Sequence, residues 1–328
     1  MARSVATRIV PLPLLIISLL AASPARSQEE SYQADALLRK AAAAMGVDAL
    51  STLRYTAAGT GGGVGQPYTA GKAWPMQNLS LTRSVHFESG TLIDEVTRSR
   101  AGDLRGGTAV PLTGEQKLIE AVSGNAAWNV VGSNVVPGGR WVAERAPLVW
   151  LNPHGAIKAA RRNATTLAWR TEGQRSLGAV SFSVPGVMKA TLLINDQYLV
   201  ERIEASVPNP VLGDMPVVTS FSEYRDFGAV KFPTRIEEKQ GGFDTASLIV
   251  TDVQPNAKVD LAVPQAAREA RETVTSQRLG TGVWLIAGGS HNSVAVEARD
   301  HVVVIEGPLY DDRAGPVIDE VKKLVPGK

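Results

Sequence analysis

The stretch Leu199–Ser206 reads LVERIEAS, and it decides the fold because its side chains alternate with a period of two. One face of the extended chain takes Leu199, Glu201, Ile203 and Ala205. The other face takes Val200, Arg202 and Glu204. Such alternation predicts a β-strand in a sheet that has one face in water and one face against a core.

Runs of the same kind recur on both sides of this stretch, separated by turn sequences such as Pro185–Gly186 and Asn195–Asp196. The predicted strands are Thr166–Arg170, Ala179–Val184, Lys189–Ile194, Leu199–Ser206, Val217–Tyr224, Val230–Glu238 and Ala246–Val253. Closer to the N-terminus, shorter runs predict strands at Leu79–Phe87, Leu92–Arg98 and Trp128–Val131. Strands joined by short connections indicate an antiparallel meander rather than alternating parallel units.

A few helices are expected to cover the dry face of this sheet. Residues 31–45 have apolar residues at helical spacing, and Gly46 is a suitable C-terminal stop. Thr113 with Gln116 predicts a short helix through Ala121, and Pro153 opens another that runs to Arg162. The expected fold is therefore α+β, with an antiparallel, half-barrel-like β-rich domain over residues 28–264.

The first 27 residues have the order of a secretory signal peptide: two early arginines, an apolar run over 9–22, and small residues at Ala25 and Ser27. We expect cleavage after Ser27 and a periplasmic or secreted protein without a stable membrane anchor. The alternative, an uncleaved anchor, is disfavoured because the apolar run is short and contains Pro11 and Pro13. The chain has no cysteine, which excludes disulfides and thiolate ligands.

Charge argues against nucleic acid as a partner. Removing residues 1–27 takes three of the 34 basic residues and none of the 32 acidic ones, so the two are nearly equal, and no basic tract remains.

Residues 265–328 change in character. Residues 265–279 are expected to form a linker, helical and alanine-rich over Gln265–Val274. Three β-branched runs then predict strands at 283–287, 293–297 and 301–305, followed by a helix over 312–325. The apolar stripe of that helix consists of Val317, Ile318, Val321, Leu324 and Val325. Three strands and a helix are too few to bury a separate core, so we expect residues 280–328 to be the start of an incomplete domain.

Residues typical of a catalytic or metal site are sparse. The four histidines lie far apart in the sequence, and none is paired at metal-ligand spacing. Ser290 is not a nucleophile elbow, because Asn292 stands where that motif requires glycine. The glycine-rich stretch Gly59–Gly65 matches no phosphate-binding motif, and it favours a loop or a glycine-rich strand. Three residues remain as candidates for a binding loop: His154, Asp214 and His291.

The last fifty residues resemble the start of the metallo-β-lactamase fold. The resemblance rests on Gly282–Ile286, Gly288–Ser293, Val294–Glu297, His301–Glu306 and the helix that follows Pro308. It implies an exported hydrolase with a long β-rich N-terminal region and two zinc ions in full-length relatives. The family's His-x-His-x-Asp-His run does not occur before Lys328. We therefore expect no catalytic residue, no metal ligand, no bound cofactor and no activity in the chain as given.

A second resemblance lies in the β-rich region, where Tyr224, Asp226, Phe227 and the run Val230–Pro233 are similar to half-barrel sheets of periplasmic lipoprotein carriers. Two functions follow. The first is the N-terminal portion of a metal-dependent hydrolase that acts on a small-molecule substrate. The alternative is a non-catalytic binding or carrier-like module for an apolar or lipid-like ligand.

Overall fold

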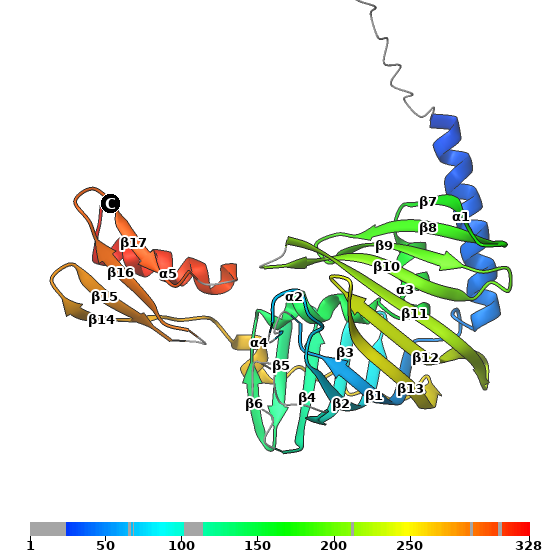
Figure 1. The fold of residues 1–328 in the computed structure, drawn as a ribbon, viewed down its shortest axis with the longest axis horizontal. Coiled ribbons are helices and arrows are strands. Elements are labelled where there is room, and N and C mark those ends of the chain that lie inside the picture. The colour runs from blue at the N-terminus through cyan, green and yellow to red at the C-terminus, as the bar shows by residue number, and fades with distance from the viewer. Residues whose placement is uncertain are drawn as a thin grey trace, which may run out of the picture.

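The computed structural model describes residues 24–64, 67, 69–101, 114–210, 213–288, 291–307 and 310–328. They form two antiparallel sheets, one large and one small, with a few helices (Figure 1). The expected antiparallel, β-rich architecture is confirmed. The apolar run of the predicted signal peptide lies outside the described residues.

The large sheet has thirteen strands in the order β6-β5-β4-β3-β2-β1-β13-β12-β11-β10-β9-β8-β7. Along the chain these strands are β1 Thr52–Gly62, β2 Met76–His86, β3 Thr91–Arg100, β4 Gln116–Ser123, β5 Ala126–Val131, β6 Asn134–Pro137, β7 Thr165–Glu172, β8 Arg175–Val184, β9 Met188–Ile194, β10 Val200–Asn209, β11 Gly213–Phe227, β12 Val230–Gln240 and β13 Phe243–Pro255. All neighbours pair antiparallel, so the predicted meander is confirmed. One long-range pairing, β1 with β13, joins two meanders into one sheet.

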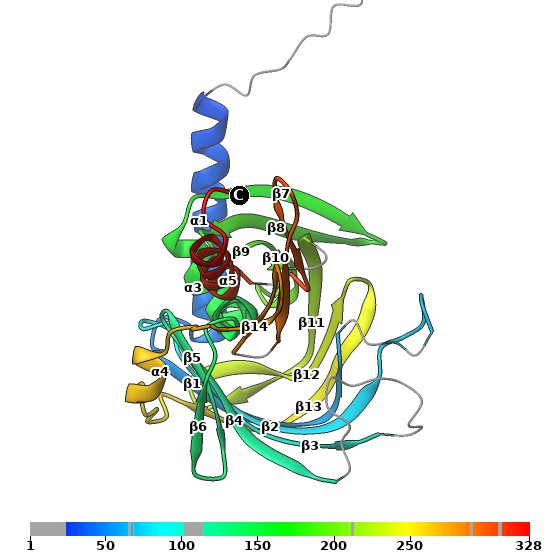
Figure 2. The same ribbon diagram turned by 90° about the vertical axis from the view of Figure 1, so that its left-hand side faces the viewer.

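The sheet is open and strongly curved, and helices occupy its concave side (Figure 2). These are α1 Pro24–Met45, α2 Trp141–Arg145, the 3-10 helix η1 Ala146–Val149, and α3 Pro153–Arg162. Helix α1 lies against β7 and α3, while α3 packs on β8 and β10. Helix α3 has the predicted bounds, whereas α1 begins earlier than predicted, at Pro24. The helices cover the buried face of the sheet, as the alternation in the sequence predicted.

Helix α1 ends where the sequence predicted, because Gly46 has a left-handed φ of 71°. A Cβ at this position would lie 2.0 Å from the carbonyl oxygen of Ala229, in the turn between β11 and β12. The Val47 amide donates to the Ala42 carbonyl at 2.9 Å and satisfies one of the last carbonyls of the helix. Only glycine allows the chain to reverse this close to the sheet.

The short helix predicted from Thr113 to Ala121 is wrong: the described part of this segment belongs to β4, and Thr113 lies outside the described residues. The local capping pattern is overridden because β4 pairs on both sides, with β3 and with β5. A two-residue loop, Gly124–Asn125, joins β4 to β5, and Gly124 has a φ of 54°. A loop of this length and composition is a hairpin signal, and it is the feature that would have identified the strand.

The small sheet contains β14 Thr275–Gly280, β15 Val283–Ala287, β16 Ser293–Glu297 and β17 Val302–Ile305, with helix α5 Asp311–Leu324 packed on it. The three predicted strands and the helix are present, and β14 is an additional strand. Helix α4, Gln265–Glu269, lies in the predicted linker.

The expectation that this part is an incomplete metallo-β-lactamase fold is not supported, and its physical premise fails. The helix stripe was expected to lack a partner sheet. Instead, Val317 and Val321 are buried against Ile286 and Ala295, so the four strands and α5 form a small core of their own. Ile318, from the same predicted stripe, faces outward and is half exposed.

Candidate functional site

A cavity of about 450 Å³ lies between the large sheet and the helical segment on its concave side. Strands β1–β4 and β11–β13 form one wall. The other wall is formed by Leu148, in η1, and by Leu151, between η1 and α3. Its apolar lining includes Leu79, Leu81, Val96, Phe221, Ile236 and Leu248. Volumes of about 300 to 1,000 Å³ with mostly apolar walls are typical of small-molecule sites.

Strand register explains the apolar wall. Ala57, Leu81 and Val96 are direct neighbours across β1, β2 and β3, and all three are buried. A cross-strand row of this kind places side chains on one face of the sheet, with small and large residues side by side. The row continues into the other meander through Val250 of β13, the buried neighbour of Ala57.

Glycines leave the space open at one end of β1. Gly61, Gly62 and Gly63 line the cavity, and a Cβ at Gly61 would lie 3.0 Å from Cδ2 of Leu79. Strand β1 runs through Gly62, so the glycine-rich stretch is a strand over most of its described length, as the sequence favoured. A side chain at Gly61 would lie on the same face of the sheet as Leu79 and Leu81 and would take up part of this space, whereas a Cβ on Gly62 would meet Met76 and the backbone of β13.

A polar row borders the apolar wall. Tyr55, Arg83, Asp94 and Glu120 are consecutive neighbours across β1 to β4. Arg83 donates to both carboxylate oxygens of Asp94, at 2.8 and 2.7 Å, and Arg98 donates to Glu120 at 2.6 Å. Each arginine that lines the cavity is therefore already bonded to a carboxylate.

Burial and charge act in opposite directions on Arg83. Burial lowers the pKa of its guanidinium. The nearby Asp94 carboxylate and Tyr55 hydroxyl raise this pKa by more than burial lowers it, so the pKa lies above its ordinary value. Burial also raises the pKa of the Tyr55 phenol above its ordinary value. At neutral pH the row thus contains one cation, two carboxylates and a neutral phenol, and Arg98 beside the row supplies the second positive charge, so these charges are compensated.

Thr219 and Glu238 form a second polar position in the cavity. They lie directly opposite each other across β11 and β12, and both line the cavity. Glu238 accepts from Thr245 at 2.9 Å and from Gln240 at 2.8 Å. The Thr219 hydroxyl is buried and has no hydrogen-bond partner in the part of the chain that the structure describes.

The helical wall is fixed by Arg145 and Asn152. Arg145 donates to the carbonyls of Ala121 and Trp128 at 3.1 and 2.9 Å, which ties α2 to β4 and β5. Asn152 caps α3, because its Oδ1 accepts from the Gly155 amide at 2.8 Å. Burial lowers the pKa of Arg145 below its ordinary value. These bonds hold the wall that carries Leu148 and Leu151.

The three candidate binding-loop residues are not brought together. His154 lies in α3, fully buried, with its ring stacked on Phe232 at 5.6 Å and its Nε2–H donating to the Met45 carbonyl at 3.0 Å. Asp214 is exposed at the start of β11. His291 is exposed before β16 in the small sheet, and its carbonyl accepts from Arg313. None of the three lines the cavity.

Sequence reasoning missed the residues that do line the cavity. Arg83, Asp94, Thr219 and Glu238 come from four strands of two meanders. The available signal was their position in the alternation of each strand. Arg83 lies between the buried residues Leu81 and Val85 of β2, two positions from each. Asp94 lies in the same way between Leu92 and Val96 of β3. Charged residues in phase with a buried face mark a paired or functional position.

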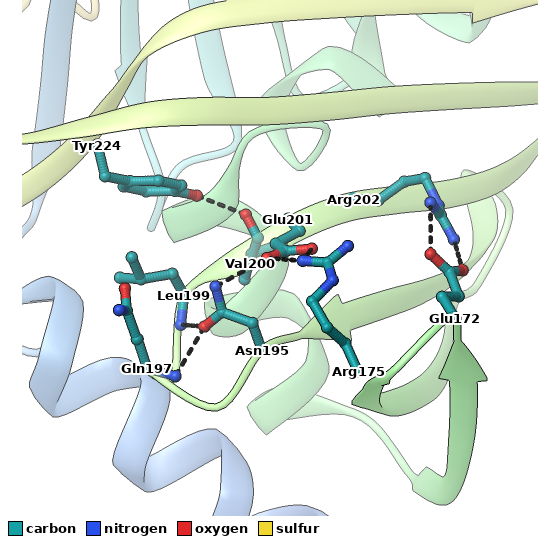
Figure 3. Close-up of polar contacts among 9 residues, drawn as sticks. All are labelled: Glu172, Arg175, Asn195, Gln197, Leu199, Val200, Glu201, Arg202 and Tyr224. Carbon is teal, nitrogen blue, oxygen red and sulfur yellow. Dashed lines mark hydrogen bonds and ion pairs between the residues drawn. The ribbon is translucent and has the colours of Figure 1, made fainter.

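A second hollow, of about 630 Å³, lies among β8, β10, β11 and the turn between β9 and β10 (Figure 3). Its charged side chains bond mainly to one another: Arg175 donates to Glu201 at 2.8 Å, and Arg202 donates to Glu172. Asn195 Oδ1 accepts from the amides of Gln197 and Leu199 and so forms the turn. These contacts support the turn and the sheet surface, and we do not select this hollow as the site.

No group of three or more histidine, aspartate or glutamate side chains that could hold a metal ion occurs among the described residues. Among the described helices, none is both long and apolar enough to cross a membrane.

The chain was compared with family models, curated proteins and solved structures. No family model matches the chain, and no curated protein matches it. Among solved structures, a LolA superfamily protein from Nitrosomonas europaea matches with 13% sequence identity and a TM-score of 0.44, over 69% of this chain and 94% of that one. This likeness concerns the backbone only, and no ligand or activity is transferred from it.

The resemblance to the metallo-β-lactamase fold is wrong. No family model and no curated protein supports it, and residues 275–324 form a four-stranded antiparallel sheet and a helix that share a small core. The predictions of hydrolase activity and of zinc ions in longer relatives rested on this resemblance and are therefore unsupported.

Proposed function

We propose that this protein is a non-catalytic binding module that holds an apolar or amphipathic small molecule in the cavity on the concave face of the large sheet. The observation that carries this proposal is the cavity itself, about 450 Å³, with an apolar wall and two arginine–carboxylate pairs at its border. Apolar walls with a few placed polar groups are the usual composition of ligand pockets.

The arrangement of groups favours binding over chemistry. The two arginines that line the cavity are bonded to carboxylates, and the Tyr55 phenol is kept neutral by burial. A general acid or base needs a group that exchanges protons near neutral pH, and these groups are held away from that range. Export to the periplasm or beyond, with cleavage after Ser27, is part of the proposal and would place the module where apolar molecules need a carrier.

The test is binding of N-phenyl-1-naphthylamine, an uncharged apolar dye that fluoresces when it leaves water. Gly63→Leu would place a side chain at the cavity without backbone strain, because a Cβ there meets nothing closer than the Pro75 carbonyl oxygen at 3.9 Å. Gly280→Leu is the matched control: a Cβ on Gly280 also has open space around it, but that residue lies in the small sheet.

We expect saturable dye binding by the wild-type chain and by Gly280→Leu, and binding at least tenfold weaker by Gly63→Leu. Equal binding by all three proteins would place the dye elsewhere and would refute the proposal, as would an absence of saturable binding by the wild-type chain.

A further inference from the structure

The cavity is lined by more acidic than basic side chains, and one of the acidic side chains has no ion pair among the described residues. Two arginines, Arg83 and Arg98, line it together with three carboxylates, those of Asp94, Glu120 and Glu238. Both arginines are used in ion pairs, with Asp94 and Glu120. Glu238 is held by neutral donors, and within the described part of the chain it has no ion pair within 4 Å. Of the five charged side chains that line the cavity, Glu238 is therefore the one without an ion pair to a described residue; Arg145, outside the lining, adds a 3.9 Å contact to Glu120.

An anionic head group would find no free cation in this cavity. To reach a guanidinium it would have to displace Asp94 from Arg83, which would leave Asp94 unpaired, or Glu120 from Arg98, which would leave Glu120 with only its 3.9 Å contact to Arg145. A buried charge without a partner is strongly unfavourable. A carboxylate or phosphate head would also be repelled by Glu238, and repulsion between like charges is strong where water is excluded.

A second observation gives the position of the head group. Thr219 is 2% exposed, and its buried hydroxyl has no hydrogen-bond partner in the described part of the chain. It lies opposite Glu238 in the ladder between β11 and β12. A buried hydroxyl without a partner costs free energy, and a ligand group that bonds to it removes this cost. Thr219 and Glu238 together present two oxygens that accept hydrogen bonds.

The apolar part of the ligand has room beside this pair. Phe221 and Ile236 are the next pair on the same face of the same two strands, and Leu248 follows on β13. A tail that leaves the Thr219–Glu238 pair in this direction meets apolar side chains only along this row.

We infer that the ligand is an amphiphile whose head group donates hydrogen bonds and carries no negative charge, a long-chain amine or alcohol, and that Thr219 and Glu238 bind this head group. This inference rests on the proposed function and goes beyond it, since it states which amphiphiles the cavity accepts and which it rejects.

The experiment compares three ligands that share one tail: dodecylamine, 1-dodecanol and dodecanoate. Each is titrated against the complex of the full chain with N-phenyl-1-naphthylamine, below the concentration at which it forms micelles. We expect the amine and the alcohol to displace the dye, and dodecanoate to require at least a tenfold higher concentration. This comparison needs no variant, so it does not depend on the folding of one.

Two variants locate the effect. Thr219→Val keeps the shape and removes the hydroxyl, so affinity for the amine and the alcohol is expected to fall severalfold relative to the dye affinity of the same variant. Glu238→Gln is expected to reduce the difference between amine and carboxylate. Glu237→Gln is the control, because Glu237 is exposed and bonds to Arg235 outside the cavity.

The outcomes separate the two proposals. Dodecanoate that displaces the dye as well as the amine does would overturn the inference and leave the proposed function standing. Unchanged ligand preference in Thr219→Val and Glu238→Gln would also overturn it, because the head group would then bind elsewhere. Failure of the dye to bind the wild-type chain would remove both proposals.

Discussion

Arg83 and Asp94 face each other across β2 and β3 and are joined by two hydrogen bonds, from Nε to Oδ1 at 2.8 Å and from Nη2 to Oδ2 at 2.7 Å. Their side chains are only 14% and 6% exposed. Two parallel charge-assisted bonds fix both the distance and the orientation of the pair. The pair therefore compensates the charge that the fold places beside an apolar cavity.

Asp94→Asn is expected to lower the free energy of unfolding by about 3 to 5 kcal/mol, the range for a buried ion pair that loses one partner. The cause is the Arg83 guanidinium, which stays charged and buried without a counter-charge. The measurement is urea denaturation followed by circular dichroism. Replacing both residues, Arg83→Met with Asp94→Leu, should restore most of the loss, because no buried charge remains.

The control for this prediction is Arg175→Gln, which breaks the exposed pair with Glu201 shown in Figure 3. Exposed pairs contribute at most about 1 kcal/mol, and this variant should stay within that limit. If Asp94→Asn were no more destabilising than Arg175→Gln, the view that Asp94 compensates a buried charge would be wrong.

Stability should fall as the pH is lowered from 6.5 to 4, because of His154. Burial lowers its pKa from the model-peptide value of 6.5 to about 4, so the folded protein keeps this imidazole neutral. In the unfolded chain His154 takes up a proton below pH 6.5. The unfolded state then binds more protons than the folded state in this window, and the free energy of unfolding decreases by up to about 3 kcal/mol. Above pH 6.5 this contribution is constant.

The measurement is urea denaturation at pH 7.0 and at pH 4.5. His154→Gln, which retains a donor for the Met45 carbonyl, should lose less stability between the two pH values than the wild type. His86→Gln, at a partly exposed position at the end of β2, should behave as the wild type. Carboxylates titrate in all three proteins, so only the difference between them reports on His154. An identical pH dependence for the wild type and His154→Gln would contradict the assignment.

Local sequence patterns were sufficient for most strands and for helix α3, whose bounds, Pro153 and Arg162, match the prediction. Alternation, turn residues and a first-turn proline are encoded within a few positions, and the meander keeps neighbouring strands close in the sequence. The segment Gln116–Ala121 was mispredicted because a capping pattern was weighed without its partners, β3 and β5, which supply the ladder.

The cavity could not be predicted from local patterns. It depends on the pairing of β1 with β13, strands separated by most of the chain, which brings Tyr55 and Arg83 to the same concave surface as Thr219 and Glu238. No periodicity within a strand encodes that pairing. The position of α5 shows the same limit: its stripe was visible in the sequence, but β14, which completes the sheet beneath it, was not.

Tyr224→Phe is expected to destabilise the protein by about 1 to 2 kcal/mol, since it removes one hydrogen bond and leaves a carbonyl without this donor. The Tyr224 hydroxyl donates to the Val200 carbonyl at 2.6 Å, at the irregular start of β10 (Figure 3). Tyr198→Phe is the control, because its hydroxyl has only a long contact, 3.5 Å, with the exposed Lys40. If urea denaturation showed the two variants to be equally destabilised, the hydrogen bond to the Val200 carbonyl would not contribute the expected stability.

Val317→Ala is expected to open the small sheet while the large one stays intact. Val317 is 1% exposed and packs in a core of four buried residues, whereas the large sheet has a far more extensive core. Loss of two buried methyl-sized groups costs roughly 2 kcal/mol, a large share of what so small a core supplies. Amide hydrogen exchange should therefore accelerate in β14–β17 and α5 and stay unchanged in β8–β12. Ile318→Ala, at the next position but half exposed, should leave exchange unchanged in both sheets. Faster exchange throughout the chain in Val317→Ala would mean that the two sheets unfold as one unit, and the independence of the small core would be refuted.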